Sequence, residues 1–266
     1  MTYTAAVSYL YGLQKHGIKL GLDTMTALVG RLGMPQSRYR SLHIAGTNGK
    51  GSTAALTAAM FQAGGYRVGL YTSPHLVEFG ERIRVDGRMI SETDIARLTE
   101  LVKGISEPDV SPTFFEFTTA MALQYFAASQ VDLAVLEVGL GGRFDATNVV
   151  SPLASAITTI ALDHQQYLGN TLESVAFEKA GIIKPNVPVI LGRLPREARD
   201  TIQRTAVELD APVFCLGRDF QDEGETPTRF KYSGFGRRYD ELSCPLLGAH
   251  QLENCACALS LVETSR

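Results

Sequence analysis

The feature that most constrains the fold is a glycine-rich run at residues 46–53, with the sequence GTNGKGST. An apolar run at 41–45 precedes it and predicts a short buried strand, and an alanine-rich run at 54–61 follows it and predicts a helix. This order is typical of a phosphate-binding loop. Glycines let backbone N–H groups turn toward an anion, and the helix N-terminus adds partial positive charge. Lys50 adds a full positive charge.

The sequence of this loop departs from the common G-x-x-x-x-G-K-[ST] pattern, because Gly51 separates Lys50 from Ser52. The alternative interpretation is a tight glycine turn with a lysine that faces solvent. The strand, the glycines, the lysine, the hydroxyl groups and the helix occur together, and this combination favours the phosphate site.

Composition and charge exclude several classes of protein. The chain has 266 residues, a net charge of −3 and a pI of about 6.0, so we expect no nucleic-acid partner. Charged residues interrupt every apolar run and residues 1–4 lack the basic start of a signal peptide, so we expect no membrane association. The four scattered cysteines favour small buried thiols in a reducing cytoplasm over a metal site.

Predicted strands and helices alternate along most of the chain, and this alternation predicts an α/β fold with a doubly wound, mostly parallel sheet. From about 227 to 244 the pattern changes to short alternating segments, which we interpret as a small antiparallel β appendage. Pro108 and Pro112 bracket a loop. The predicted strands lie at 41–45, 66–72, 81–87 (a short edge strand and turn), 131–138, 152–159, 187–191 and 213–216. The predicted helices lie at 3–33 (with a break at Gly17 and a restart at 23), 54–64, 92–103, 114–128, 171–180, 196–209 and 250–262.

Polar groups follow four of the predicted strands. The loop at 46–53, Ser73, Glu137 and His164 each come at the carboxyl end of a strand, where doubly wound sheets bind ligands. If these strands are neighbours, a hydroxyl, a carboxylate and an imidazole line one crevice and could hold a divalent ion. Magnesium prefers oxygen ligands, and the histidine would also suit manganese. The alternative for His164 is a structural residue that is hydrogen-bonded near a strand end.

Three further segments allow both a functional and a structural interpretation. The glycine-rich run 139–148 contains an arginine, an aspartate and an asparagine, which favours a ligand-facing loop over a bare turn. Residues 114–117 (FFEF) at a helix start could present an aromatic face to a flat ring, and core packing explains them equally well. Composition alone predicts that Lys179 is a surface lysine near a helix end.

Several motifs together resemble the folylpolyglutamate synthases and dihydrofolate synthases of the Mur ligase superfamily. The agreement in order and spacing covers nearly the whole chain and is more specific than the phosphate loop alone. The matching runs are residues 46–53, 72–76, 81–84, 136–148, 163–164, 178–184 and 248–254.

The resemblance implies an ATP-dependent amide ligase of the cytoplasm, with a monomer as the family default. ATP would phosphorylate a carboxylate of dihydropteroate or of a folate, and the amino group of L-glutamate would then displace phosphate from the acyl phosphate. The sequence does not decide between dihydrofolate synthesis, glutamate-tail extension and both, although the aromatic segments favour both.

The resemblance also implies roles for individual residues. The residues expected to hold ATP are Gly49, Lys50, Gly51, Ser52 and Asn254. The residues expected to hold Mg²⁺, in one or two sites where Mn²⁺ could substitute, are Ser73, Glu137 and His164. Lys179 matches a lysine that the family carries as a carbamate, so Lys50, Lys179 and His164 are the catalytic candidates. The residues expected to contact the pterin substrate are Phe114, Phe115, Glu116, Phe117, Phe144, Asp145 and Ala146, with the connector at 21–23 as a further candidate.

The resemblance further predicts that residues 1–247 form the ATP-binding domain, including the β appendage, and that residues 248–266 form a helix that leads to a Rossmann-like C-terminal domain. That domain would begin where the sequence stops, so we expect the chain as given to bind nucleotide weakly and to show little or no ligase activity. Two alternatives remain: a peptidoglycan precursor ligase that acts on a nucleotide-linked muramyl substrate, and a non-catalytic nucleotide-binding fragment. The runs 73–76 and 81–84 favour the folate ligase over the first alternative.

Overall fold

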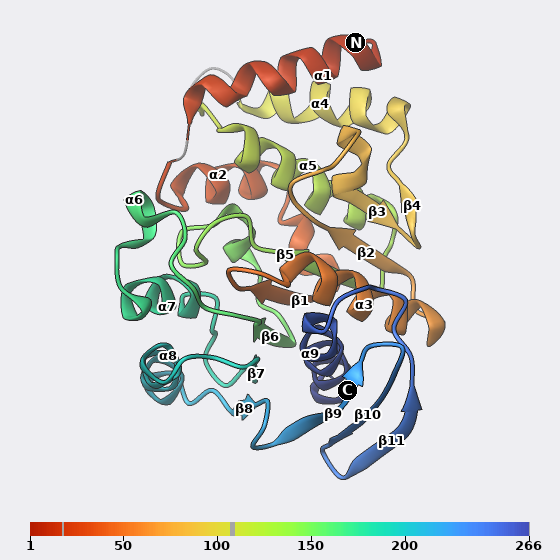
Figure 1. Ribbon diagram of the computed structural model, residues 1–266. Helices are drawn as coiled ribbons and strands as arrows, with labels where there is room; N and C mark the ends of the chain where they lie inside the picture. The colour runs from red at the N-terminus through yellow and green to blue at the C-terminus, as the bar shows by residue number, and fades with distance from the viewer. Residues whose placement is uncertain (18, 107–109, 266) are drawn as a thin grey trace.

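The computed structural model describes residues 1–17, 19–106 and 110–265. An eight-stranded sheet in the order β4-β3-β2-β5-β1-β6-β7-β8 crosses the molecule (Figure 1). Neighbouring strands from β2 to β8 are parallel, whereas β3 and β4 form an antiparallel edge, which confirms the predicted mostly parallel α/β sheet. The strands are β1 (Arg40–Ala45), β2 (Val68–Tyr71), β3 (Ile83–Val85), β4 (Arg88–Met89), β5 (Leu133–Glu137), β6 (Ala154–Ile157), β7 (Val189–Leu191) and β8 (Val213–Cys215).

Helices cover both faces of this sheet, because successive side chains of each strand point to opposite faces and both sets are apolar. In β5, Ala134 and Leu136 enter a core with α1, α2, α4 and α5, whereas Leu133 and Val135 enter a core with α3 and α9. Helices α7 and α8 pack together beside β7 (Figure 1). The helices are α1 (Tyr3–Gly12), α2 (Asp23–Arg31), α3 (Lys50–Ala63), α4 (Glu92–Ser106), α5 (Phe114–Ala128), α6 (Gln165–Leu168), α7 (Leu172–Ala180), α8 (Arg196–Glu208) and α9 (His250–Thr264), with short 3-10 turns η1 (Leu13–His16), η2 (Pro35–Arg38), η3 (Phe79–Arg82) and η4 (Ala146–Val149).

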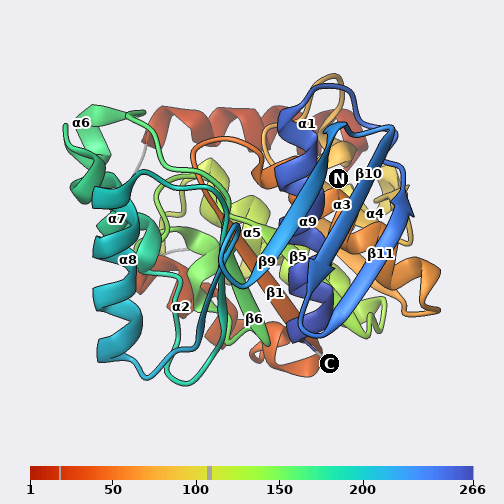
Figure 2. The same ribbon diagram turned by 60° about the horizontal axis from the view of Figure 1, so that its bottom comes forward.

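A second sheet of three antiparallel strands forms the predicted appendage. It comprises β9 (Phe220–Thr226), β10 (Arg229–Gly234) and β11 (Arg237–Leu242), which lie side by side next to α9 (Figure 2). The appendage therefore starts earlier than the predicted residue 227. The run QDEGE at 221–225 has the composition of a loop, and it becomes a strand because Phe220 and Tyr232 anchor the sheet in the core beside α9.

Other boundaries also differ from the prediction. Helix α3 starts inside the glycine run, at Lys50, because Gly49 turns the chain with a left-handed φ of 82°. The edge strand and turn predicted at 81–87 are present as β3 and the turn after it, but the strand starts two residues later, behind η3, and the turn leads into a further strand, β4. Helix α5 has the predicted bounds, and Thr171 caps α7 as predicted, accepting a hydrogen bond from the Ser174 N–H at 3.1 Å. Pro108, one of the two prolines predicted to flank a loop, lies outside the described residues.

No helix within the described ranges combines the length and the apolar character needed to cross a membrane.

Candidate active site

Four neighbouring strands bring their carboxyl ends to one edge of the sheet. The strands β2, β5, β1 and β6 are adjacent and parallel. Ser73 follows β2, Glu137 ends β5, the loop 46–53 follows β1, and His164 lies beyond β6. The segments that the sequence assigned to strand ends therefore converge, because the strands that carry them are neighbours.

The segment after β6 holds the glycine loop in place. Thr158 Oγ1 donates to the Asn48 carbonyl at 2.6 Å, and the Asn48 N–H donates to Thr159 Oγ1 at 2.9 Å. Gly46 has no room for a side chain, since a Cβ there would lie 2.0 Å from Thr158 Oγ1. Sequence reasoning missed both threonines, because two hydroxyls at a strand end carry no signal of the loop that they support.

Two lysine ammonium groups meet at the first carbonyl of the loop. Lys50 Nζ donates to the carbonyl oxygens of Gly46 and Thr47, both at 3.0 Å, and Lys179 Nζ donates to the Gly46 oxygen at 2.9 Å. The prediction from composition that Lys179 is a surface residue is wrong, because the end of α7 packs against the loop and leaves the side chain 4% exposed. Burial, together with the charge of Lys50, lowers the pKa of Lys179 to about 8. Burial also lowers the pKa of Lys50, although Glu137 and Asp163 oppose this effect.

The depressed pKa of Lys179 predicts a pH-dependent stability. The unfolded chain binds the lysine proton at the ordinary pKa of 10.5 and the folded chain only at about 8, so the wild-type protein loses stability as pH falls through this window. We expect the stability advantage of Lys179→Met over wild type to grow by about 2 kcal/mol between about pH 10 and about pH 8. Chemical unfolding in carbonate-free buffer measures it, with the exposed Lys15→Met as control. A wild-type-to-variant difference that does not change with pH would contradict the assignment.

Glu137 presents a buried carboxylate beside the loop. Its Oε2 accepts a hydrogen bond from the Ser73 N–H at 3.0 Å, and the side chain is 5% exposed. Burial raises the pKa of Glu137, while the Ser73 N–H and the Lys50 charge act in the opposite direction. The loop passes close to this carboxylate, since a Cβ on Gly51 would lie 3.3 Å from Oε2. A buried carboxylate with a serine next to it is a donor set that suits a hard cation such as Mg²⁺.

His164, the third predicted metal ligand, makes no hydrogen bond or ion pair with Ser73 or Glu137 within the described residues. It adopts a left-handed φ of 46° before α6, and its side chain is 54% exposed. Within the part of the chain that the structure describes, its ring pairs only with Asp163, at 3.7 Å between Nε2 and Oδ2. No three His, Cys, Asp or Glu side chains converge into a metal cluster in those same ranges. Ser73 and Glu137 are therefore joined by a hydrogen bond, whereas His164 pairs with Asp163, whose charge acts on both Lys50 and Lys179.

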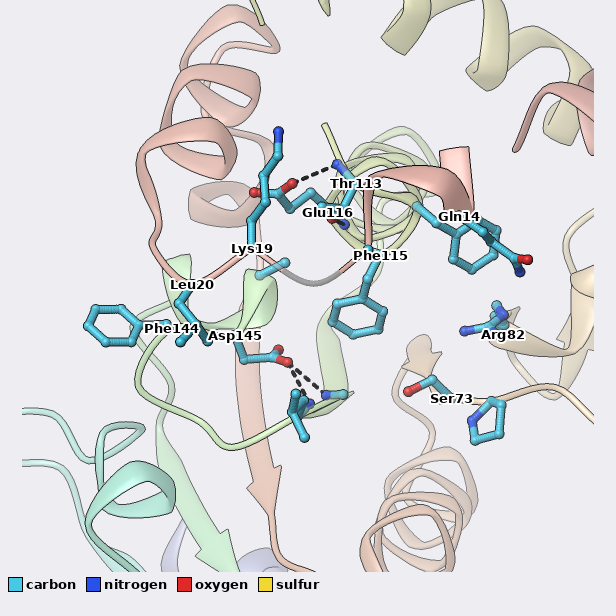
Figure 3. A pocket seen from close by; sticks show the side chains of 16 residues that line it. Gln14, Lys19, Leu20, Ser73, Arg82, Thr113, Phe115, Glu116, Phe144 and Asp145 are labelled. Atoms are coloured by element: carbon cyan, nitrogen blue, oxygen red, sulfur yellow. Dashed lines mark hydrogen bonds between the residues drawn. The ribbon is translucent and has the colours of Figure 1, made fainter. Parts of the chain in front are cut away.

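An aromatic cavity of about 350 Å³ opens next to Ser73 (Figure 3). In Figure 3, Asp145 and Phe144 lie on one side, Ser73 and Arg82 on the other, and the Phe115 ring stands between them. Six of the predicted substrate residues line it, whereas none of the connector 21–23 does. The lining residues are Gln14, Gly17, Lys19, Leu20, Ser73, Pro74, Arg82, Thr113, Phe114, Phe115, Glu116, Gly139, Leu140, Phe144, Asp145 and Ala146.

Phe117, the remaining predicted substrate residue, does not line this cavity. It is 0% exposed in the core, with its ring centroid 5.5 Å from that of Tyr9. The helical period of α5 turns it away from Phe114 and Phe115, so the core-packing interpretation describes this one residue of the aromatic run. Glu116 lines the cavity, but its carboxylate caps α5 by accepting a hydrogen bond from the Thr113 N–H at 2.7 Å.

The polar side chains of the glycine-rich run 139–148 bond to the protein itself. Arg143 pairs with Glu178 at 2.6 Å, and the Asn148 amide donates to the carbonyls of Arg143 and Gly181 at 3.0 Å. Asp145 is likewise buried within the run. Of these three residues, only Asp145 lines the cavity.

Arg82 is a charged residue that sequence reasoning named only as part of a motif. Its side chain lines the cavity although the residue is just 7% exposed. Its Nε donates to His75 Nδ1 at 2.7 Å, and its guanidinium lies 5.1 Å from the centroid of the Phe114 ring. Among the described residues, the Nε bond to His75 is the one hydrogen bond of the Arg82 side chain, and a buried arginine of this kind provides a partner for a carboxylate.

A second cavity, of about 480 Å³, is lined by residues of the glycine loop, of the segment after β6 and of α9. Asn254 lies directly against the loop, because a Cβ on Gly49 would come within 2.3 Å of its Oδ1. The lining residues are Asn48, Gly49, Ser52, Thr158, Thr159, His250, Glu253, Asn254 and Cys257.

These features define an α/β domain with a phosphate-binding loop at the carboxyl edge of its sheet, flanked by two cavities and two buried lysines. Residues 44–262 match the family model described as the Mur ligase middle domain. The chain therefore belongs to the Mur ligase family.

Its relatives are folate ligases. The chain is 40% identical to the dihydrofolate synthase/folylpolyglutamate synthase of Bacillus subtilis, an alignment that covers 98% of this chain and 63% of the relative. A solved FPGS–AMPPCP–folate complex superposes with a TM-score of 0.92 at 36% identity, over 100% of this chain and 67% of that one. A bifunctional folylpolyglutamate synthase/dihydrofolate synthase with Mn, AMPPNP and L-glutamate bound superposes with a TM-score of 0.88 at 34% identity, over 100% and 63%. This chain thus spans about two thirds of the length of these proteins.

Proposed function

We propose that this chain is the ATP-binding part of a ligase that joins L-glutamate to dihydropteroate or to a folate. The observation that carries the proposal is the convergence of Lys50 and Lys179 on the Gly46 carbonyl, with Glu137 across the loop and an aromatic cavity beside it. The aromatic cavity accepts a flat ring, and the cavity at α9 accepts a nucleoside. The bound ligands of the two solved relatives, AMPPCP with folate and AMPPNP with L-glutamate, support ATP, a folate and L-glutamate as the substrates.

In this proposal, the reaction brings several anions together. A carboxylate oxygen of the folate attacks the γ-phosphorus of ATP, ADP leaves, and an acyl phosphate forms. The amino nitrogen of glutamate then attacks the acyl carbon, phosphate leaves and a proton is released. Because both steps crowd negative charge, catalysis depends on cations and oriented backbone dipoles. Lys50, the loop N–H groups and the N-terminus of α3 supply these for the phosphates, and Arg82 supplies positive charge at the aromatic side.

Glu137 and Ser73 would hold a Mg²⁺ ion beside the phosphates, and Mn²⁺ could replace it. When bound, the ion neutralises phosphate charge. The carboxylate suits this role because its Oε2 is already oriented by the Ser73 N–H. His164 would be the third ligand, and its ring would then exchange its pairing with Asp163 for the ion.

We further propose that Lys179 is the lysine that forms a carbamate. Its pKa of about 8 leaves part of the amine neutral and nucleophilic near neutral pH, so its nitrogen can add to carbon dioxide with loss of one proton. The product is an anion beside Lys50. After addition of ¹³C-bicarbonate, a carbamate resonance is expected for wild type and is expected to be absent from Lys179→Met.

The four cysteines are free and buried, which supports a reducing compartment such as the cytoplasm for this reaction.

Ligand selectivity tests the proposal. We expect AMPPNP with Mg²⁺ and pteroate each to raise the melting temperature, and a UDP-linked muramyl compound to leave it unchanged. The reverse selectivity between pteroate and the muramyl compound would favour the peptidoglycan precursor ligase, and a response to nucleotide alone would favour a binding module. In the whole protein, ADP release is expected to require both dihydropteroate and Mg²⁺, and dihydrofolate formation is expected to require L-glutamate as well.

The metal role of Glu137 gives a separate prediction. In Glu137→Gln we expect AMPPNP affinity to lose the gain of about tenfold that Mg²⁺ confers on wild type, since a hydrogen bond or contact to a charged group contributes about 1.5–3 kcal/mol. Glu116→Gln is the matched control, because its carboxylate is similarly buried and also accepts from a backbone N–H. Calorimetric titration with and without Mg²⁺ measures both variants. An unchanged Mg²⁺ effect in Glu137→Gln would remove Glu137 from the metal site.

A further inference from the structure

Three buried side chains form a hydrogen-bonded relay behind one wall of the aromatic cavity. Residues 139–146 form this wall. Nε2 of His43, on β1, lies 2.7 Å from Thr147 Oγ1, and the Thr147 hydroxyl donates to Asp145 Oδ1. The Thr147 backbone N–H donates to the same oxygen at 3.0 Å. All three residues are at most 5% exposed. The relay therefore links β1, the central strand that precedes the glycine loop, to the cavity.

The Asp145 carboxylate joins the two ends of this wall. Its Oδ2 accepts hydrogen bonds from the N–H groups of Gly139 at 3.0 Å and Leu140 at 2.9 Å, and all three residues line the cavity. Gly139 has no space for a side chain, since a Cβ there would lie 2.5 Å from the Phe115 ring. The position of the wall thus decides where the central aromatic ring of the cavity can stand (Figure 3).

The hydrogen bonds of this relay have one consistent donor-to-acceptor direction. Burial and the charge of Lys184 lower the pKa of His43 to about 3, so the imidazole is neutral and carries one N–H. Nδ1 has no partner among the described residues, and the Thr147 hydroxyl is already directed at Asp145. The proton therefore sits on Nε2, and His43 donates to Thr147.

Apolar packing does not account for an imidazole at this position. A leucine would fill the buried site without leaving a ring nitrogen unpartnered, and an unpartnered buried polar atom costs free energy. The only hydrogen bond that the His43 ring makes within the described residues is the one to Thr147. The contribution of His43 thus lies in holding Thr147, and through it Asp145.

We propose that His43 and Thr147 are positioning residues for the aromatic substrate, which act through the Asp145 carboxylate to hold the wall formed by residues 139–146. The proposal rests on the proposed function in that the ligand of this cavity is taken to be a pteroate ring. It does not involve the nucleotide, since the Asp145 hydrogen bonds reach the aromatic cavity and not the cavity at α9.

Affinities of the wild-type chain, Thr147→Val and Thr147→Ser for pteroate and for AMPPNP with Mg²⁺ test the proposal. Valine keeps the shape of threonine and removes the hydroxyl, whereas serine keeps the hydroxyl. We expect Thr147→Val to weaken the affinity for pteroate about tenfold and to leave the affinity for AMPPNP unchanged. Thr147→Ser is expected to bind pteroate with an affinity within about threefold of wild type. His43→Leu, which removes the donor without touching the wall, is expected to reproduce the selective loss and serves as the test if Thr147→Val does not fold.

Three outcomes would overturn the proposal. Pteroate affinity equal to wild type in Thr147→Val and His43→Leu would mean that the relay does not position the wall. An equal loss for pteroate and AMPPNP, or no recovery with serine, would mean that the residues support the fold in general. Absence of pteroate binding by the wild-type chain would overturn the proposed function and this inference together, whereas the first two outcomes leave the proposed function intact.

Discussion

Lys50→Met is expected to weaken AMPPNP binding about a hundredfold in the presence of Mg²⁺. The Lys50 ammonium is held against the carbonyls of Gly46 and Thr47 at 3.0 Å, at the start of the helix whose N-terminus faces the same space. A phosphate anion would accept hydrogen bonds from this buried ammonium, and charge-assisted hydrogen bonds are the strong ones. Loss of a partner of that kind costs about 1.5–3 kcal/mol, which corresponds to a factor of about ten to a hundred in affinity.

Lys19→Met is the matched control for Lys50→Met. Lys19 carries the same charge near the site, but it lines the aromatic cavity and donates to the Ser111 carbonyl at 2.6 Å. We expect it to leave AMPPNP affinity within about twofold of wild type. Calorimetric titration of the three proteins at one salt concentration measures the difference. Equal AMPPNP affinity in Lys50→Met and wild type would mean that the glycine run is a turn with an unused lysine.

Gly49→Ala is expected to destabilise the fold by about 1–3 kcal/mol more than Gly65→Ala. Both glycines adopt left-handed backbone, with φ of 82° and 87°, so alanine pays a similar conformational cost at each. The difference lies in their surroundings. A Cβ at Gly49 would lie 2.3 Å from Asn254 Oδ1, whereas a Cβ at Gly65 meets nothing within 4 Å.

Asn254 cannot easily yield to the new methyl group, because it is 4% exposed and its amide donates to Gln251 Oε1 at 2.8 Å. We therefore expect Gly49→Ala to push the loop away from α9 and to weaken the affinity for AMPPNP as well. Denaturant unfolding measures the stability of both alanine variants, and Asn254→Ala in the Gly49→Ala background is expected to recover part of the loss. Equal destabilisation by the two alanine variants would show that the loop and α9 do not press on each other.

Much of the fold could be predicted from the sequence because it depends on local patterns. The apolar run of β5, the alanine-rich run of α3 and the Thr171 cap of α7 are signals within a few residues. The miss at 221–225 has a non-local cause. The polar run at 221–225 reads as a loop, and its conversion into β9 depends on two aromatic anchors, of which Tyr232 lies in the neighbouring strand.

The candidate site could be predicted only in part. The glycine loop, Ser73 and Glu137 were predictable because strand ends in a parallel sheet meet at one edge. The exposed position of His164 was not, since a left-handed turn after β6 directs its ring toward Asp163. Phe117 could not be separated from Phe114 and Phe115 until the orientation of α5 was known.

By itself, the sequence determined the alternation of strands and helices, the loop that suits a phosphate group, and the family that these motifs indicate. The tertiary structure alone decided that Lys179, which lies 129 positions beyond Lys50 in the chain, shares the Gly46 carbonyl with it, and that His43 reaches Asp145 through Thr147. The reason is physical: the pKa of Lys179 and the tautomer of His43 depend on burial and on charges brought near by folding, and neither quantity is a property of a residue and its neighbours in sequence.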